Sequence, residues 1–359
     1  MAAVSGLAKR NAVALLWHCT KVVLLALLPL RKCLAMSFGG YCTRCNTHHV
    51  LPTTDEAKRQ ALDLRDRIVR SGRIDIDELP AEKQEQLLSL PSGSSDEKDE
   101  GILSFPVDDK QNAESFLDLN LDPLLATERL YERRGKMFGV LICEAPRNDS
   151  TTSGSTLYGS QSIPDPHTTF IPRQEGDIVV LKAYAGKLGG QWNLPGWAPL
   201  VGKVPESIPE FRRRSAEVTE LFEKIDSLSL KKESPDTEES VAVAEQIKEL
   251  TKERSRLSTL CIAELRRHQV LKNFRGIRMP IADAFVKGPN KLPGGTGDCA
   301  APKLLAQAVK LGLKPTGICE IFIGATGGMS TTKDDGKFYD ACEPRCQQIA
   351  GHMLCGLEI

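Results

Sequence analysis

Two stretches near the C-terminus decide the fold, TGDCAAPKLLAQAVKLGLKPTGICEIFIG (296–324) and FYDACEPRCQQIAGHMLCGL (338–357). A glycine-rich turn places Cys299 at the start of a predicted helix, and an apolar predicted strand follows. A second predicted helix opens with Cys342 and Cys346, whose spacing puts both on one helix face. Helix N-termini favour thiolate over thiol, so these positions suit metal ligands.

The three cysteines together predict a zinc site, because thiolate sulfur is a preferred zinc ligand. The alternative is a reduced core without metal, since cysteine is among the most buried residue types. His352 is a spare candidate for a fourth ligand. Small buried hydrophobic roles are expected for the other cysteines of the core region, Cys143, Cys261, Cys319 and Cys355.

The amino-acid composition limits which classes of binding partner are expected. The chain has 359 residues, is 41% hydrophobic, and balances 47 basic against 47 acidic side chains. No global basic field indicates nucleic acid, so DNA is not an expected partner and any RNA contact needs a local patch. The 11 cysteines are too sparse for a small disulfide scaffold and favour metal ligation or a reduced compartment.

Residues 1–35 form a basic hydrophobic leader. No Asp or Glu precedes Asp55, and NAVALLWHCTKVVLLALLPL (11–30) is predominantly apolar, with Lys21 in its middle. This pattern predicts a transit peptide for a plastid or mitochondrion, with membrane contact only if the leader is kept as an anchor. The run VVLLALLPL also fits a signal-peptide core, as in the first half of a bipartite plastid leader. If Met36 is the true start, the protein is instead expected in the cytoplasm.

Residues 36–80 carry a Cys/His loop and a helix. YCTRCNTHHVLP (41–52) offers Cys42, Cys45, His48 and His49 as a second metal site, with a reduced loop as the alternative. Apolar residues at helical spacing follow, and 81–134 reads as a polar linker with a short helix in DPLLATERLYERR.

Two further segments complete the organisation. Residues 135–205 predict a β-hairpin from MFGVLIC and DIVVLKAYAG, joined by a loop disordered at its tip, then a segment in which Trp192 and Trp197 pack as a core lid or stack bases. Residues 206–275 predict a coiled-coil-like helical hairpin. Its basic residues form a solvated face or a phosphate-contacting edge, and the RNA-contacting candidates are Arg212, Arg213, Arg214, Arg266, Arg267 and Lys272.

The order of elements resembles that of zinc-dependent nucleoside deaminases. The expected fold is therefore α/β (α+β), a deaminase-like three-layer domain with 206–275 as an insertion and 276–359 as the cysteine-bearing module. In active deaminases a Glu follows the first ligand by two residues and transfers protons. That position here is Ala301, and we do not expect Glu320 or Glu343 to replace it. No catalytic residue is assigned.

The same residues also resemble a region that precedes the catalytic domain in some RluA-type pseudouridine synthases. GKMFGVLIC (135–143), LKAYAGKLGGQWNLPGWAPLV (181–201) and the two C-terminal stretches carry the resemblance. The Arg-Leu-Asp motif of the catalytic domain is absent from this sequence. The resemblance implies a non-catalytic zinc-bearing accessory module in RNA modification that binds RNA or a synthase-type partner. The alternatives are a deaminase-like hydrolase with an unusual base and a scaffold built on the helical hairpin.

Overall fold

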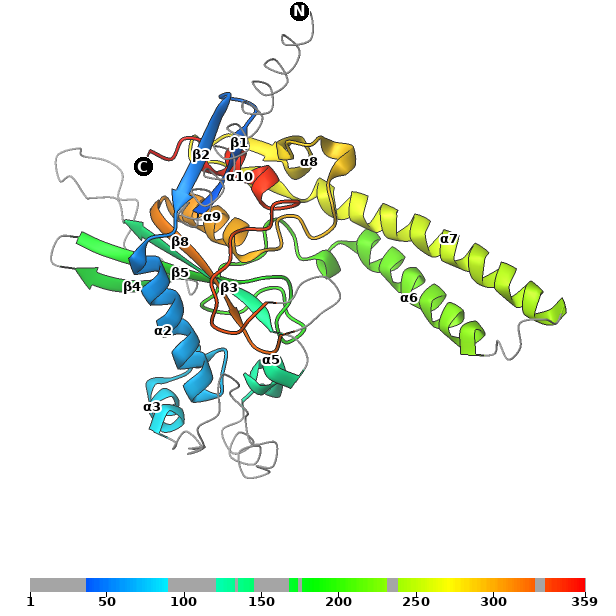
Figure 1. Cartoon of the computed structure of the whole chain (residues 1–359), viewed down its shortest axis with the longest axis horizontal. Coiled ribbons are helices and arrows are strands. Elements are labelled where there is room, and N and C mark those ends of the chain that lie inside the picture. Colours follow the sequence, from blue (N-terminus) through cyan, green and yellow to red (C-terminus); the bar gives the residue numbers. More distant parts are fainter. Residues whose placement is uncertain are drawn as a thin grey trace, which may run out of the picture. The chain divides into compact units, whose positions relative to one another are not determined.

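A four-stranded antiparallel sheet organises the chain, with strand order β4-β5-β3-β8 (Figure 1). The strands are β3 (Lys136–Glu144), β4 (Thr168–Arg173), β5 (Gly176–Tyr184) and β8 (Lys314–Ile323). The two predicted hairpin strands and the C-terminal apolar strand thus lie in one sheet. The edge strand β4 lies within the polar segment that the sequence predicts to be a loop, so the loop prediction is wrong for these residues.

The computed structural model describes residues 37–89, 121–132, 135–144, 168–173, 176–230, 238–326 and 333–358. The predicted leader 1–35, the most polar part of the linker 81–134 and the tip of the loop before β4 lie outside the described residues. Ser37–Ile359 packs as one unit. The predicted mixed α/β class is confirmed. No described helix has the length and apolarity that a membrane span requires.

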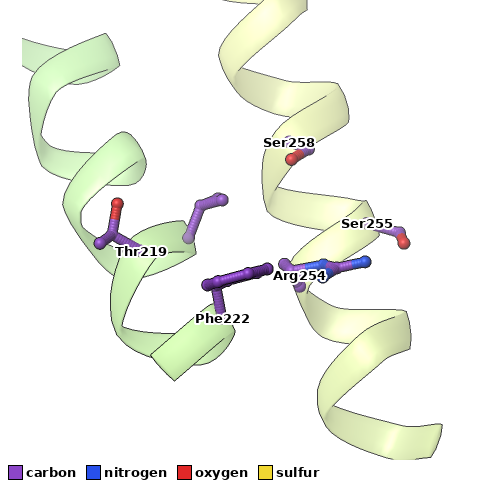
Figure 2. A pocket seen from close by; sticks show the side chains of 6 residues that line it. Thr219, Phe222, Arg254, Ser255 and Ser258 are labelled. Atoms are coloured by element: carbon purple, nitrogen blue, oxygen red, sulfur yellow. The ribbon is translucent and has the colours of Figure 1, made fainter. Parts of the chain in front are cut away.

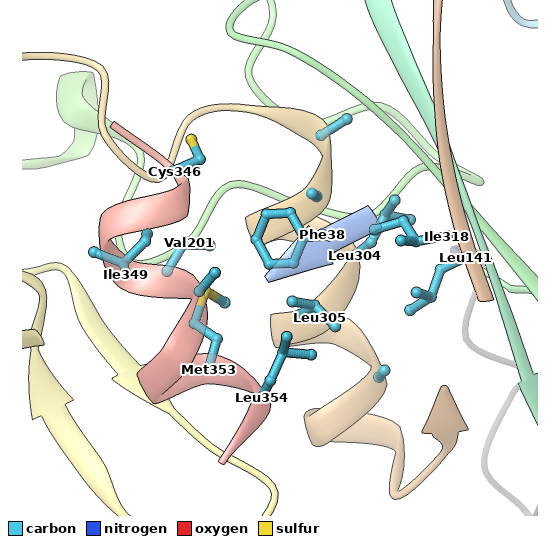
Figure 3. Close-up of a cluster of buried hydrophobic side chains, with 14 of the residues drawn as sticks. Phe38, Leu141, Val201, Leu304, Leu305, Ile318, Cys346, Ile349, Met353 and Leu354 are labelled. Carbon is cyan, nitrogen blue, oxygen red and sulfur yellow. The ribbon is translucent and has the colours of Figure 1, made fainter. Parts of the chain in front are cut away.

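Both faces of the sheet are buried, which explains why β3 and β8 are almost continuously apolar. On one face lie α9 (Ala300–Leu311), α10 (Gln347–Leu354) and the hairpin of β1 (Ser37–Cys42) and β2 (Thr47–Pro52). Figure 3 shows the apolar side chains between these elements, among them Phe38, Leu141, Leu304, Ile318 and Met353.

The opposite face is covered by α2 (Asp55–Ser71). Its apolar side chains Ala57, Ala61, Leu64 and Ile68 recur at helical spacing and are all buried, as the sequence predicts. Thr54 accepts a hydrogen bond from the amide of Ala57, and Gly72 ends the helix in the left-handed conformation. The result is a sheet between two layers of other elements.

Trp197 and Trp192 have different environments. Trp197 is fully buried between Phe138 and Tyr184, with ring centroids 5.7 and 5.5 Å away, so it packs in the core as the lid interpretation expects. Trp192 lies at the surface, where its Nε1–H donates to Glu206 at 2.9 Å. Of the two rings only that of Trp192 reaches the surface, and the Lys187 ammonium lies 5.3 Å from its centroid.

The predicted helical hairpin consists of α6 (Pro209–Leu230) and α7 (Glu238–Arg267), which pack mainly against each other (Figure 1). α6 has no fully buried residue. Short elements make the remaining connections: η2 (Ile76–Glu78), α3 (Ala81–Ser89), η3 (Pro123–Leu125), α5 (Glu128–Glu132), η4 (Pro205–Ser207), β6 (Val270–Lys272), β7 (Arg278–Pro280), α8 (Ile281–Ala284) and η5 (Pro289–Lys291).

Candidate metal centres

The sulfur atoms of Cys299, Cys342 and Cys346 lie within 4.8 Å of one another, and we call these residues the three-thiol group. Cys299 is the N-cap residue of α9 and Cys346 that of α10. Cys342 lies in the turn before α10, so the prediction that this helix opens at Cys342 is wrong by about one turn. Glu343 and Pro344 belong to the same turn, and the amide of Cys346 donates to Cys342 Sγ at 3.4 Å.

The spacing of the three thiols fits a zinc ion. Cys299 Sγ lies 3.9 Å from Cys342 Sγ. A tetrahedral zinc–thiolate site with Zn–S bonds of about 2.3 Å has sulfur atoms about 3.8 Å apart. A disulfide would need about 2.0 Å between the sulfurs, and all three cysteines are free. These residues could therefore hold one metal ion with three thiolates.

Of the three thiols, Cys342 is the one with a lowered pKa. Hydrogen bonds from Cys299 and Cys346 lower the pKa of Cys342 to about 2, while the pKa of Cys299 and that of Cys346 rise. Burial opposes the charge on the Arg345 guanidinium, but the neighbouring thiols outweigh it and raise its pKa. These shifts favour a thiolate at Cys342 beside the Arg345 cation, and a cysteine must be deprotonated to bind a metal.

Glu320 approaches the three-thiol group from β8. Its Oε1 accepts a hydrogen bond of 3.1 Å from the amide of Ala301, one of the unpaired donors at the start of α9. Burial raises the pKa of Glu320 to about 7, with the Ala301 amide acting in the opposite direction. Glu320 therefore lies beside Ala301 at the start of α9, whereas Glu343 is exposed.

The space beside Glu320 is small. A cavity lined by Phe38, Ala301, Glu320 and Tyr339 has a volume of about 10 Å³. Such a volume holds about one water molecule, whereas small-molecule sites usually measure about 300–1,000 Å³. This cavity is therefore too small for a nucleobase.

A second group consists of Cys42, Cys45, His49 and Cys355, whose ligand atoms also lie within 4.8 Å of one another. We call it the four-ligand group. Cys45 Sγ is 3.0 Å from His49 Nε2 and 3.8 Å from Cys355 Sγ. The hydrogen bond between Cys45 and His49 lowers the pKa of Cys45 to about 6, although desolvation acts in the opposite direction.

The sequence prediction for this second group needs two corrections. His48 is not a member, because successive strand residues point to opposite faces and His48 pairs with the exposed Tyr41. Cys355, expected to be only a small hydrophobic residue, is buried but contributes its sulfur to the group. Its place directly after α10 was visible in the sequence, but the distant partner was not. His352, the spare candidate, belongs to neither group.

Most of the basic candidates on the hairpin are already paired. Arg213 contacts Glu210 at 2.7 Å and Glu217 at 2.6 Å, and Arg214 also contacts Glu210. Arg267 pairs with Glu264, and Arg266 donates to the carbonyl of Leu292. The two remaining candidates, Arg212 and Lys272, are exposed.

A hollow of about 550 Å³ lies between α6 and α7, away from both cysteine groups, and is lined by side chains such as Thr219, Phe222 and Ser258 (Figure 2). Arg254 lies 6.0 Å from the centroid of the Phe222 ring. Phe222 is 57% exposed, and the lining has no acid, thiol or imidazole, so this hollow offers little chemistry despite its size.

Cys143, Cys261 and Cys319 lie apart from both groups and are buried, as expected of small hydrophobic residues. The chemistry of the described chain therefore centres on the three-thiol and four-ligand groups. No protein-family model, curated protein or solved structure matches the chain.

Proposed function

We propose that the chain is a non-catalytic, zinc-bearing accessory module in RNA modification, binding RNA or a pseudouridine synthase-type partner. The observation that carries the zinc part is the convergence of Cys299, Cys342 and Cys346 at two helix starts. These three thiolates would hold the ion. When bound, zinc supplies a Lewis acid and a firm link between the segments that ligate it.

A deaminase-like ancestry of the module is part of the proposal. It is supported by the order β5-β3-β8 in the sheet, by α9 leading from Cys299 into β8, and by the second cysteine pair before α10. Gly139 lets α9 approach closely, because a side chain at Gly139 would meet the methyl group of Ala300 at 2.8 Å. This contact fixes the start of α9 over β3.

The absence of catalysis in the proposal rests on two features. Ala301 is fully buried and its methyl group cannot transfer a proton. The cavity beside Glu320 holds about one water rather than a substrate. A protein with these features is better suited to binding than to turnover.

Metal analysis tests the zinc part. Purified chain should contain zinc, and Cys299→Ser, Cys342→Ser and Cys346→Ser should each lose one equivalent. Cys143→Ala, a buried cysteine outside both groups, is the matched control and should lose none. Full zinc content in all three serine variants would refute the three-thiol site.

Filter binding tests the RNA part. Retention of structured RNA at low salt should fall steeply as salt is raised, because binding to phosphates releases counterions. The double variant Arg212→Ala/Lys272→Ala should weaken retention more than Arg213→Ala, whose side chain is already paired with acids. If the chain retains no RNA at low salt and carries none on purification, RNA binding is excluded and only the protein partner remains.

A hydrolytic activity is the second candidate, and one observation favours it. Glu320 is a buried carboxyl group that has a pKa of about 7 through burial and lies beside the three-thiol group. A general acid–base works best when its pKa lies near the operating pH. Deamination of nucleosides or free bases that disappears in both Cys299→Ala and Glu320→Gln would establish this function. Ammonia release unchanged in either variant would exclude it.

A further inference from the structure

The β1–β2 hairpin and the end of α10 bring the four-ligand group together. We propose that Cys42, Cys45, His49 and Cys355 form a closed structural zinc site that fastens the N-terminal hairpin to the C-terminal helix. This site is separate from the three-thiol group and goes beyond the function proposed above.

The turn between β1 and β2 is shaped to present two thiols. Residues 43–46 form the turn, so Cys42 ends one strand and Cys45 lies at the tip. Asn46 has φ of 56°, and it is the one non-glycine residue with positive φ in the described chain. Left-handed backbone at a non-glycine residue is uncommon and costs free energy, so it persists where the surroundings require it. Here it reverses the chain directly after Cys45.

Strand register selects His49 as the nitrogen ligand. Gly40 pairs with His49 and Cys42 pairs with Thr47, so Cys42 and His49 lie on the same face of the hairpin. That face also carries the buried Phe38 and Leu51 and is turned toward α10. The imidazole of His49 is therefore on the side of the hairpin where the sulfur atoms of Cys42, Cys45 and Cys355 lie.

Two glycines let α10 reach this face. A side chain at Gly40 would collide with the carbonyl of Gln347, and one at Gly351 would collide with the backbone of Tyr41. The helix therefore lies directly on the β1 backbone, and its C-terminus delivers Cys355 to the hairpin turn. In Figure 1 the red α10 is drawn beside β1 and β2.

The donor set matches zinc. Three sulfurs and one imidazole nitrogen are a standard set for a four-coordinate structural zinc site, which leaves no open position for a reactant. The distance of 3.8 Å between Cys45 Sγ and Cys355 Sγ equals the edge of a zinc–thiolate tetrahedron, about 3.8 Å. It is too long for a disulfide, which needs about 2.0 Å.

Zinc content of purified full-length variants tests the site. Wild-type chain should contain two equivalents, Cys355→Ser and His49→Ala one each, and His48→Ala two. His48 is the matched control, because it is the neighbouring imidazole on the other face of the same strand. Cobalt substitution gives a second readout: Cys355→Ser should remove one set of tetrahedral thiolate–cobalt absorption bands, and the set due to the three-thiol group should stay.

The outcomes separate this site from the function proposed above. If wild-type chain holds a single equivalent that Cys355→Ser removes and Cys299→Ser does not, the four-ligand site stands and the three-thiol site falls. If Cys355→Ser and His49→Ala both keep the wild-type zinc content, the four-ligand site is refuted. Loss of zinc in His48→Ala but not in His49→Ala would equally overturn it.

Discussion

Cys45 and Cys355 have sulfur atoms 3.8 Å apart, although 310 positions separate them in the chain. This contact joins the first described hairpin to the last described helix. It lies on the same side of the sheet as α9, whose N-terminus carries the three-thiol group. The stability of that layer should therefore depend on how closely β1 and α10 pack, and the following predictions begin there.

Gly40→Ala should loosen the four-ligand group. The added methyl group would collide with the carbonyl of Gln347, and overpacking of this kind costs about 1–3 kcal/mol of the free energy of unfolding. Zinc should also pass faster to a colorimetric chelator. Gly294→Ala is the control, since its methyl group would only touch the Ile262 side chain at 3.8 Å. Equal unfolding midpoints and release rates in the two variants would contradict this account of the packing.

Lys303 should make stability depend on pH. Its side chain is fully buried and donates to the carbonyls of Tyr184 at 2.9 Å and Gly186 at 3.0 Å. Burial lowers the pKa of Lys303 to about 8. An unfolded lysine keeps its proton up to about pH 10.4, so the unfolded chain binds more protons between about pH 8 and that value. The Lys303 contribution to the free energy of unfolding therefore rises with pH in this window, by roughly 3 kcal/mol.

The difference between wild type and Lys303→Met isolates this contribution. Urea unfolding can be measured at a series of pH values. The free energy of unfolding of wild type minus that of Lys303→Met should increase as the pH rises from about 8 to 10. Lys314→Met, at an exposed position on β8, should run parallel to wild type. A constant difference between wild type and Lys303→Met would mean that Lys303 titrates alike in both states.

Removal of the outer part of the helical hairpin should leave the metal sites intact. α6 has no buried residue and packs mainly on α7, so the described residues within 221–255 contribute little to the sheet and its covering layers. With a short Gly-Ser linker in their place, the zinc content should equal that of the full chain and the melting temperature should shift by only a few degrees. Loss of zinc on this deletion would show that the hairpin supports the centres.

Self-association through the hairpin is the expectation of the scaffold alternative. Phe222, Leu230 and Val241 are 57%, 80% and 64% exposed, which leaves apolar surface for a second copy. Leu257 is buried within the chain, so a charge at Leu257 would also disturb folding, and Phe222→Glu is the cleaner variant. If the chain is an accessory module, analytical sedimentation should show a monomer for both wild type and Phe222→Glu. An oligomer in wild type alone would favour the scaffold.

Trp197→Ala and Trp192→Ala should differ in stability and in RNA binding. Truncation of the fully buried Trp197 should cost about 3–5 kcal/mol, because it leaves a cavity between Phe138 and Tyr184. Trp192→Ala should change stability less, and it should weaken RNA retention if this half-buried surface ring stacks on bases. Urea unfolding and filter binding of the two variants check this, and equal stability losses would contradict it.

The sequence by itself determined the local elements and their buried faces. The helical spacing of apolar residues from Ala57 to Ile68 identified α2, and the apolar run around Ile318 identified β8. Both follow from hydrophobic periodicity, because the apolar face of an element is the one that becomes buried. The same reasoning placed Cys299 at a helix start and paired the helices α6 and α7.

Only the tertiary structure decided which distant side chains meet. The local pattern predicts that Cys355 is buried, but it does not show which element packs against it. Which cysteines come together in space likewise cannot be deduced from the sequence. The choice of His49 over His48 follows from strand register, and the position of Glu320 at the start of α9 follows from the face that β8 presents to that helix. These relationships arise from packing between elements far apart in the chain, which no local pattern encodes.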